Sequence, residues 1–287
     1  MIPYHGSISC CVFPLSTTTE VKMVKGENGL KSLIDGKMAN EKELERVKIL
    51  VDVVRAITHD NSSLEIDGRS NFPVGVGLGS SSSAFASLAL ALYEIFDLGN
   101  YGVRVSSLAR WGAASAARSA TGGFSELLIN DDPYSVRLDD GLEMGILMLP
   151  AEKVVDTNSV HRVVASSPLF KARMDYVEKV LEEMRSSIKD GDIKRIGELA
   201  ERDTLNLHAI TIDVGVICWS SETLRAIEIV KNIREREGID CHYSIDTGAT
   251  TYVNCYPEDL DDVKAFFEGF EVLSGEVGGG AHLVYNE

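Results

Sequence analysis

Hydrophobic and polar positions follow two different periods along the chain and predict a mixture of strands and helices. Residues 6–23 alternate with the two-residue period of a strand and are rich in β-branched side chains. Residues 40–58 space their apolar side chains three and four positions apart, which predicts an amphipathic helix. The apolar positions of this helix are Leu44, Val47, Leu50, Val51, Val54 and Ile57.

The same reasoning predicts the remaining elements. Helices are expected over residues 82–96, 105–119, 171–188, 193–207 and 222–237. Strands are expected over residues 64–66, 134–138, 145–149, 242–244, 250–255, 272–274 and 281–285. Asp67-Gly68 is a turn signal that should end the first of these strands.

The order of these elements predicts an α+β protein with mixed sheets packed against helices in two domains. The 287 residues are enough for two hydrophobic cores. Pro150-Ala151 is the expected hinge between them. It divides the chain into an N-terminal domain, residues 1–150, and a C-terminal domain, residues 151–287.

Composition and charge narrow the class of partner. The chain is 44% hydrophobic and 25% charged, which is typical of a globular protein. Its net charge of −16 repels nucleic-acid phosphates and anionic membrane surfaces, so we expect neither as a partner, although general solubility alone also explains such acidity. If that molecule is an anion, its pocket must reverse the field locally with Arg or Lys.

The longest apolar stretch, residues 84–96, is shorter than the roughly 20 residues that a membrane span requires. The first residues lack the pattern of a secretion signal. Five scattered cysteines form no CxxC pair and suit a reducing compartment. Together these features predict a cytoplasmic protein.

A Gly/Ser-rich segment, residues 73–83, leads directly into the apolar helix expected at residues 82–96. Glycines let the backbone approach an anion closely, and a helix N-terminus offers unpaired N–H groups. A serine hydroxyl in this position can cap the helix, donate to a phosphate or bind magnesium, for which Ser82 is the candidate. A tight turn that only allows close helix packing is the alternative. The candidate phosphate-binding residues are Gly77, Gly79, Ser80, Ser81, Ser82 and Ser83.

The pattern Pro-x-Gly-x-Gly-Leu-Gly-Ser-Ser-Ser before an Ala/Leu-rich helix resembles the phosphate-binding motif of the GHMP kinases. Residues 275–281, Gly-Glu-Val-Gly-Gly-Gly-Ala, resemble the glycine-rich C-terminal motif of the same superfamily. Alone, this second segment reads equally as a flexible turn before a terminal strand. The resemblance implies the two-domain GHMP kinase fold, with ATP and Mg²⁺ as cofactors.

Residues 113–124 resemble a Gly-Ser-Ala-Cys-Arg-Ser stretch of the mevalonate diphosphate decarboxylases, and are more similar still to archaeal phosphomevalonate decarboxylases. The resemblance implies that Arg118 binds the C1 carboxylate of the substrate and that Ser115 contributes a hydroxyl contact. A planar guanidinium suits two parallel hydrogen bonds to a carboxylate. Without the resemblance, Arg118 reads as a surface cation at a helix end. The earlier serine of the relatives falls on Ala113, so one polar contact should be missing.

Residues 244–254 are similar to the Asp-x-Gly segment of the same family. The resemblance assigns Asp246 as the base that faces the 3-hydroxyl, or as the electrostatic partner of the transferring group, with Thr247 as a substrate contact. An Asp-Thr-Gly triplet alone reads equally as a turn. His208-Ala209 also resembles a decarboxylase helix, in which we expect His208 to be structural.

The end of the substrate that carries the 5-phosphate is matched less closely. Residues 156–162 correspond roughly to the stretch that holds this phosphate in relatives, and there Ser159 and Arg162 are the candidates. Residues 2–9 look like a family segment that normally follows a Tyr-Trp-Gly-Lys motif, so the family's lysine is expected to be missing, either because the given start is truncated or because this branch does without it. Its loss would weaken phosphoryl transfer from ATP more than elimination from a substrate that is already phosphorylated.

The resemblance therefore implies ATP-dependent decarboxylation of mevalonate 5-phosphate to isopentenyl phosphate in isoprenoid biosynthesis. Four alternatives remain open: an ATP-independent mevalonate 3,5-bisphosphate decarboxylase, a diphosphomevalonate decarboxylase, an enzyme that keeps only the kinase half, and a non-catalytic ligand-binding protein. The substrate is a small anion in the first three. Relatives commonly dimerise, which implies a homodimer.

Overall fold

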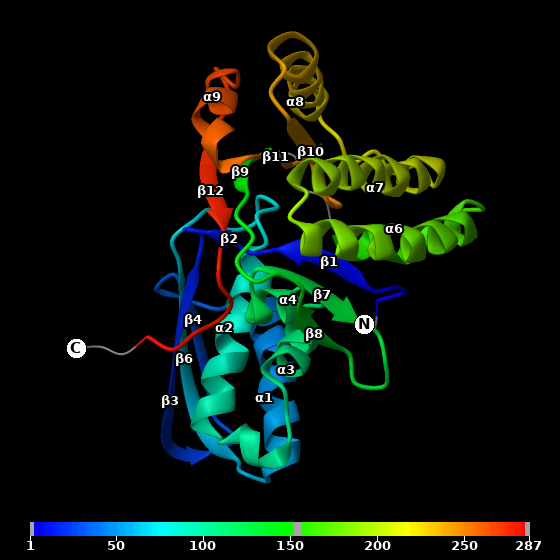
Figure 1. The fold of residues 1–287 in the computed structure, drawn as a ribbon. Helices are drawn as coiled ribbons and strands as arrows, with labels where there is room; N and C mark the ends of the chain where they lie inside the picture. The colour runs from blue at the N-terminus through cyan, green and yellow to red at the C-terminus, as the bar shows by residue number, and fades with distance from the viewer. Residues whose placement is uncertain (1–2, 152–156, 285–287) are drawn as a thin grey trace.

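The computed structural model describes residues 3–151 and 157–284 (Figure 1). Three sheets, of four, five and three strands, are packed with helices, which confirms the expected α+β class. Within the described residues, every helix falls short of the length and apolar character that a membrane crossing needs.

The four-stranded sheet forms the wall of the first half of the chain. Its order is β3 (Thr17–Glu27), β6 (Ser62–Ser70), β4 (Leu30–Ile34) and β5 (Lys37–Met38), and only β4 and β6 run parallel. Helices α1 (Glu41–Thr58) and α2 (Ser80–Ile95) lie on one side of this sheet (Figure 1). Asn40 starts α1 through a capping box with Glu43, and the apolar positions predicted for α1, apart from Leu44, pack into a core with Leu64 and Leu92.

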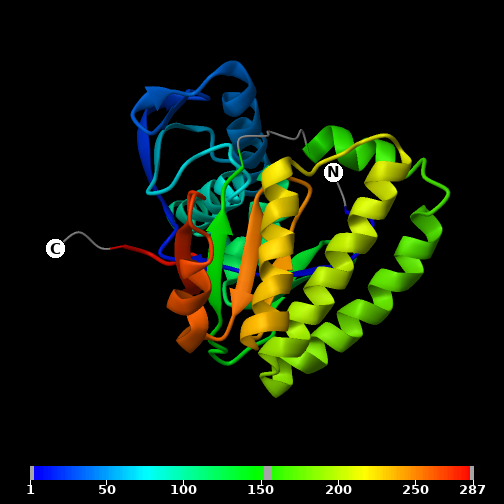
Figure 2. The same ribbon diagram turned by 90° about the horizontal axis from the view of Figure 1, so that it is seen from above.

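The five-stranded antiparallel sheet brings together strands from both ends of the chain. Its order is β10 (Cys241–Ser244), β11 (Thr251–Cys255), β9 (Gly145–Leu149), β12 (Leu273–Val277) and β2 (Val12–Phe13). Figure 2 shows α6 (Phe170–Asp190), α7 (Ile193–Asp213) and α8 (Ser221–Asn232) side by side next to this sheet. Strand β9 precedes the expected hinge, but it pairs with β11 and β12, which follow it. A domain boundary near residue 150 therefore stays a prediction.

The three-stranded sheet positions the candidate site. It has the order β1 (Ser7–Cys10), β7 (Phe124–Leu128) and β8 (Tyr134–Arg137), with Ser9 opposite Ser125. Helices α3 (Val105–Gly112) and α4 (Ala116–Thr121) precede β7, and α4 contacts both β1 and β7. The chain also forms α5 (Thr157–Val164), α9 (Leu260–Ala265), 3₁₀ turns at Leu98–Tyr101 and Pro257–Asp259, and a π-helical turn at Ile233–Glu237.

Four expectations from the sequence were wrong. The strand pattern over residues 6–23 is divided into β1, β2 and β3, with breaks at residue 11 and at residues 14–16. The helix expected over residues 105–119 is two helices, because Ala113 is extended, at φ −158° and ψ 136°, and interrupts it. Asp67-Gly68 does not end a strand: β3 supplies pairing partners along the whole of β6, which overrides the local turn preference. Residues 281–284 form no strand, and residue 285 lies outside the described residues.

Candidate active site

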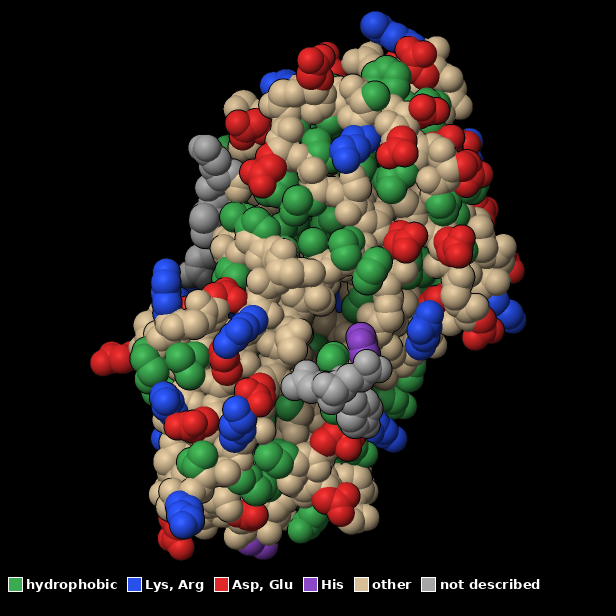
Figure 3. All heavy atoms as spheres, turned by 90° about the vertical axis from the view of Figure 1, so that its left-hand side faces the viewer, with side chains coloured by type: hydrophobic (Ala, Val, Ile, Leu, Met, Phe, Trp, Pro, Cys, Tyr) green, Lys and Arg blue, Asp and Glu red, His purple; other side chains and the backbone are tan. Residues whose placement is uncertain are grey.

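Two side chains of opposite charge, from distant parts of the sequence, lie close enough to interact electrostatically. Arg118 lies in α4, and Asp246 lies in the loop between β10 and β11. Each charge shifts the pKa of the other, yet the described residues form no direct ion pair between them. Neither side chain therefore finds a direct partner of opposite sign in the other. Figure 3 shows that one face of the molecule is hollowed near its middle, with a histidine side chain beside the hollow.

Asp246 occupies a recess that water can reach. Its surface is exposed to solvent, although protein atoms surround the carboxylate on most sides. These dense surroundings raise the pKa of Asp246 above its ordinary value, and the positive charge of Arg118 opposes the rise. A carboxylate with a raised pKa is a stronger base, which suits proton abstraction near neutral pH.

Arg118 is held by hydroxyl groups and by no carboxylate. Its Nε donates to Ser9 Oγ at 2.6 Å, and its Nη1 donates to Ser7 Oγ. Its Nη2 has no hydrogen-bond partner in the described part of the chain. Desolvation lowers the pKa of Arg118, while Asp246 raises it, and an arginine stays charged in either case. The recess thus contains a cation with free donors, which can bind an anionic group.

The loop that carries Asp246 is fixed to α7 from behind. His208 on α7 is buried, and its Nε2 lies 2.9 Å from the backbone oxygen of Asp246. Thr204, one turn earlier, accepts the backbone N–H of Ile245 at 3.0 Å. Burial lowers the pKa of His208, and the neutral ring donates to the Asp246 carbonyl when its proton is on Nε2. His208 therefore touches the backbone of Asp246, as expected of a structural residue.

The Gly/Ser segment forms an open helix N-terminus. Gly77 and Gly79 adopt positive φ values of +85° and +76°, a conformation that favours glycine. The Gly79 carbonyl accepts from Ser82 and Ser83 N–H, and no side chain caps α2. Within the described residues, the N–H groups of Ser80 and Ser81 remain available to a ligand, and the helix dipole favours an anion there.

Strand β11 connects this segment to the Asp246 loop. Thr250 Oγ1 donates to Val76 O at 2.5 Å, and Tyr252 Oη donates to Gly77 O at 2.6 Å. Both residues follow Asp246 by a few positions. The structure thereby brings the candidate phosphate-binding loop and the candidate base into one neighbourhood, although they are far apart in the sequence.

Ser82 and Ser115 connect the same loop to the helix of Arg118. Their hydroxyl oxygens share a short hydrogen bond, with Ser82 buried and Ser115 half-buried. One hydroxyl is enough for a magnesium ion that takes its other ligands from phosphates and water. Among the described residues no group of three or more His, Cys, Asp or Glu could hold a metal, so magnesium would depend on those external ligands. The residues therefore fit a magnesium–nucleotide complex.

The glycine-rich C-terminal motif supports α4. Gly123 N–H donates to Gly278 O at 2.9 Å, and Gly122 forms a β-bridge with Gly279. A Cβ at Gly280 would lie 2.5 Å from Ala120 O, so only glycine allows this approach. The motif thus packs against the end of the helix that carries Arg118.

Helix α5 carries the candidates for the 5-phosphate. Arg162 is exposed, and its Nη2 donates to Ser159 Oγ at 3.0 Å. Thr247 is buried directly after Asp246. Residue 156 of the matched stretch lies outside the described residues. On the same helix, the charge of His161 interacts with Asp246, which places α5 beside the recess.

Three residues of the site were missed by sequence reasoning: Ser7, Ser9 and His161. Ser7 and Ser9 lie two positions apart on β1, and this period was the signal that could have placed them on one face of the strand. His161 had no comparable signal, because its position depends on how α5 packs onto α7 through Val160 and Ile210.

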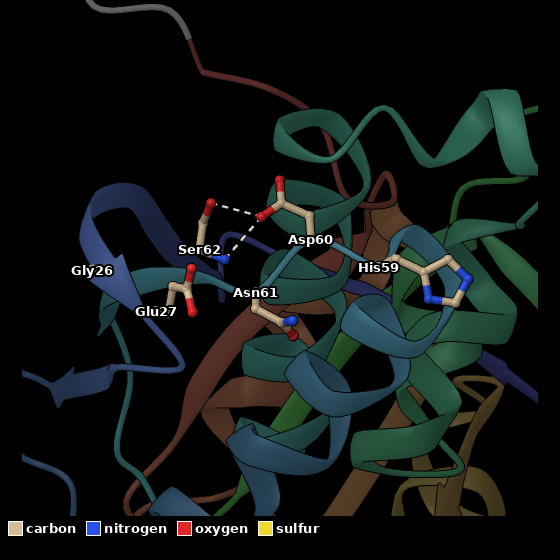
Figure 4. Close-up of a pocket in the computed structure, with 6 residues that line it drawn as sticks. All are labelled: Gly26, Glu27, His59, Asp60, Asn61 and Ser62. Atoms are coloured by element: carbon tan, nitrogen blue, oxygen red, sulfur yellow. Dashed lines mark hydrogen bonds between the residues drawn. The ribbon is translucent and has the colours of Figure 1, made fainter.

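A second hollow lies apart from these residues, between the β3–β4 and α1–β6 connections (Figure 4). Its lining is mostly acidic and polar, and Asp60 Oδ1 accepts hydrogen bonds from both the N–H and the hydroxyl of Ser62. It has no Arg or Lys in its lining, and none of the candidate site residues line it. The lining residues are Gly26, Glu27, His59, Asp60, Asn61 and Ser62.

Comparisons with known proteins agree on one family. Residues 1–135 match the model of the diphosphomevalonate decarboxylase-like N-terminal domain, and residues 156–261 match that of the mevalonate-3-kinase C-terminal domain. The phosphomevalonate decarboxylase of Haloferax volcanii is 35% identical over 99% of this chain and 90% of its own length.

Solved structures show the same fold. The mevalonate diphosphate decarboxylase of Enterococcus faecalis is 25% identical and aligns with a TM-score of 0.88 over 97% of this chain and 90% of its own. A structure of MDDEF in complex with MVAPP, AMPPCP and magnesium is 26% identical, with a TM-score of 0.89 over the same shares. The molecule has the α+β fold of the GHMP kinases.

Proposed function

The chain belongs to the phosphomevalonate and diphosphomevalonate decarboxylase family, and from this premise we propose that it converts mevalonate 5-phosphate to isopentenyl phosphate with ATP. One observation carries the proposal: Arg118 and Asp246 lie close enough for each charge to shift the pKa of the other, and yet they do not pair directly. A 3-hydroxy acid presents a carboxylate, which Arg118 could bind, and a hydroxyl group, which could donate a hydrogen bond to Asp246.

Each half of the reaction uses these two side chains. In the first, Asp246 accepts the proton of the 3-hydroxyl at a carboxylate oxygen, while Nη2 of Arg118 holds the C1 carboxylate. When bound, ATP–Mg²⁺ supplies the phosphoryl group that makes this oxygen a leaving group. In the second, the C3–O bond breaks with its electron pair going to phosphate. The C1–C2 bond then breaks, its electron pair forms the C2–C3 double bond, and C1 leaves as CO₂.

The surroundings of Asp246 help this second half. Positive charge develops on the tertiary carbon as the phosphate departs, and a nearby carboxylate stabilises it. The free N–H groups of Ser80 and Ser81 would hold the nucleotide phosphates, with Ser82 as the magnesium ligand and Ser83 in the same helical turn. Gly77 and Gly79 let the backbone approach those phosphates. We assign Ser115 and Thr247 as further substrate contacts, and Ser159 and Arg162 to the 5-phosphate.

The test is CO₂ release from three compounds, each with and without ATP–Mg²⁺: mevalonate 5-phosphate, mevalonate 3,5-bisphosphate and mevalonate 5-diphosphate. Turnover of the 5-phosphate only with ATP is expected. Turnover of the bisphosphate without ATP, with no turnover of the 5-phosphate, would assign the elimination half alone. Preference for the diphosphate would make the chain a diphosphomevalonate decarboxylase, and no turnover of any compound would leave a ligand-binding protein.

A second candidate is the kinase half alone, which the match of residues 156–261 to the mevalonate-3-kinase C-terminal domain favours. It predicts ADP formation from mevalonate or its 5-phosphate without CO₂. Measuring ADP and CO₂ in the same reaction separates the two, because decarboxylation releases them in equal amounts.

The remaining parts of the proposal concern the setting of the enzyme. We place it in the cytoplasm, with a small phosphorylated anion as its partner and neither nucleic acid nor membrane as a ligand. A homodimer is expected, and sedimentation velocity of the purified chain tests it: a single species near the mass of one chain would exclude the dimer.

A further inference from the structure

The roles proposed for Arg118 and Asp246 require the two side chains to stay unpaired when no substrate is bound. Opposite charges that are partly shielded from water attract, and a direct ion pair would offset part of the cost of desolvating both groups. Such a pair would also occupy the donors and the carboxylate that the reaction needs. Something must therefore hold the two groups apart when no substrate is bound.

We propose that Ser7 and Ser9 are positioning residues, which hold the Arg118 guanidinium through Nη1 and Nε and so prevent it from closing onto Asp246. With these two donors engaged, Nη2 is the group left free to bind an anionic ligand. That the ligand is the C1 carboxylate of mevalonate 5-phosphate rests on the proposed function, whereas the separation of Arg118 from Asp246 does not.

Strand β1 makes the two serines a rigid support. Ser7 and Ser9 are two positions apart on β1, so both side chains point to the same face. Their backbones pair with Leu127 and Ser125 of β7. The hydrogen bonds to Arg118 span 109 and 111 residues of sequence, so the serines bring an independent element to the guanidinium.

The backbone of Arg118 is held separately from its head group. Ser125 Oγ donates to the Arg118 carbonyl at 3.2 Å, and Gly122 N–H donates to the same oxygen at 2.9 Å. Ser125 faces Ser9 across the strand pair, but contacts only the backbone. It is the matched control, because its hydroxyl bonds to the same arginine through the backbone carbonyl and not through the guanidinium.

The experiment measures the ionisation of Asp246 directly, by ¹³C NMR of its labelled carboxyl in the full chain without substrate. In the Ser7→Ala/Ser9→Ala variant the guanidinium is released and can move toward Asp246. The titration midpoint of the Asp246 carboxyl should then fall by about 1 pH unit or more, because a nearer positive charge favours the carboxylate. Ser125→Ala should leave the midpoint unchanged, and Ser7→Thr/Ser9→Thr should restore it because threonine keeps the hydroxyl. Asp203, His161, Cys10 and Tyr252 also face this carboxyl, and none of them changes in these variants.

Enzyme kinetics provide a second readout that a purely structural role would not move. With Asp246 as the base, the acid limb of the kcat profile follows its ionisation, so the limb should move to lower pH in the double variant. Over the same pH range kcat/KM should fall at least about tenfold, because Nη2 is then engaged by Asp246. A structural role alone would lower the plateau without moving the limb.

The outcomes keep the two proposals distinct. An unchanged Asp246 midpoint in a folded double-alanine variant, or a threonine variant that behaves like the alanine one, would overturn the positioning role. If the double variant does not fold, the same titration in the two single variants decides. Failure of the wild type to release CO₂ from any phosphorylated mevalonate would overturn the proposed function, while the titration would still report on Ser7 and Ser9.

Discussion

At the scale of single residues, Asp246 is in surroundings that oppose its own charge. The dense protein around it and the carboxylate of Asp203 both favour the protonated form, and Arg118 and His161 offset only part of this. A folded state that raises the pKa of a carboxyl group loses stability as that group ionises. The base is therefore expected to make the folded protein less stable at neutral pH.

Asp246→Asn tests both the role of this carboxylate as a base and its cost to the stability of the folded protein. Turnover should fall by about 10²- to 10⁴-fold, because an amide cannot accept the proton. The penalty of a raised pKa is absent below the unfolded value and complete above the folded value, so at pH 7 the neutral amide should raise the thermal midpoint. The measurements are CO₂ release and thermal unfolding at pH 7 and pH 4. A near-normal rate would remove Asp246 from the mechanism, and a lower midpoint at pH 7 would contradict the stability argument.

Arg118→Lys should separate charge from geometry. Lysine keeps the positive charge but cannot reach Ser7 and Ser9 while also presenting two donors to a carboxylate. The loss in kcat/KM should be about 2 to 5 kcal/mol if the contact is desolvated. Arg104→Lys is a control, because Arg104 is exposed and stacks on Tyr134 at 4.1 Å. Equal activity of the two variants would exclude a special role for the Arg118 fork.

At the scale of elements, hydrogen bonds between the Gly/Ser segment and the start of β11 connect the candidate phosphate-binding loop to the loop that carries Asp246. Gly77 and Gly79 both have positive φ, but a Cβ at Gly77 would lie 3.0 Å from Thr250 Oγ1, whereas a Cβ at Gly79 would meet nothing within 4 Å. Alanine at either position carries the backbone strain, of about 1–2 kcal/mol. Only alanine at Gly77 also disturbs the contact with β11.

Gly77→Ala should therefore destabilise the protein more than Gly79→Ala does, and urea unfolding of the two variants measures the difference. A further loss of about 1 kcal/mol is expected for Gly77→Ala, since the Thr250 and Tyr252 hydrogen bonds to this loop would be strained. Equal stabilities would indicate that the loop yields without affecting β11.

Ser82→Ala tests whether helix α2 binds a nucleotide. The change removes the hydroxyl that meets Ser115 and the candidate magnesium ligand, so the KM for ATP–Mg²⁺ should rise about tenfold, as the loss of about 1.4 kcal/mol would give. Ser87→Ala, on the same helix but bonded to Thr19, is the control. If both variants show the wild-type KM for ATP–Mg²⁺, Ser82 does not contact the nucleotide complex.

How much the sequence could predict depends on how local each signal is. Helix α1 was predicted because its apolar period and its Asn40 cap lie within one segment. The strand β6 was predicted too short, because its length is set by pairing with β3, which lies elsewhere in the sequence. Arg118 and Asp246 were reached only through resemblance to known motifs. The support of Arg118 by Ser7 was not predictable from spacing, because 111 residues separate them.

At the scale of the whole molecule, the net charge of −16 places an anionic ligand in an unfavourable field. Other Arg side chains pair directly with a carboxylate, as Arg173 does with Asp203 and Arg185 with Glu126. Arg118 differs, because serine hydroxyls take its donors and leave its charge uncompensated by direct contact. The overall acidity and the local cation are compatible, because Arg118 is half-buried and hydroxyl groups, not carboxylates, bind its guanidinium.

The response of the whole molecule to acid should depend on Asp139. Its side chain is fully buried and accepts hydrogen bonds from Phe124 N–H at 2.7 Å, Gly141 N–H at 3.0 Å and Arg137 Nη2 at 3.1 Å. Burial alone would raise the pKa of Asp139, yet these hydrogen bonds hold it below its ordinary value. A depressed pKa gives stability that is present above the unfolded pKa, near 3.9, and is lost as pH falls through the folded one.

Asp139→Asn should therefore lower stability at pH 7 by about 1–3 kcal/mol and make the loss of stability between pH 5 and pH 3 shallower. The amide weakens the ion pair with Arg137 and places an NH₂ group where backbone N–H groups already point. Urea unfolding at a series of pH values measures both effects, with the exposed neighbour Asp140→Asn as the control. Because Asp139 connects β7 to the chain that enters β9, its loss should appear as global unfolding. An unchanged acid response would show that carboxylates elsewhere, such as Glu201 beside Arg234, dominate acid unfolding.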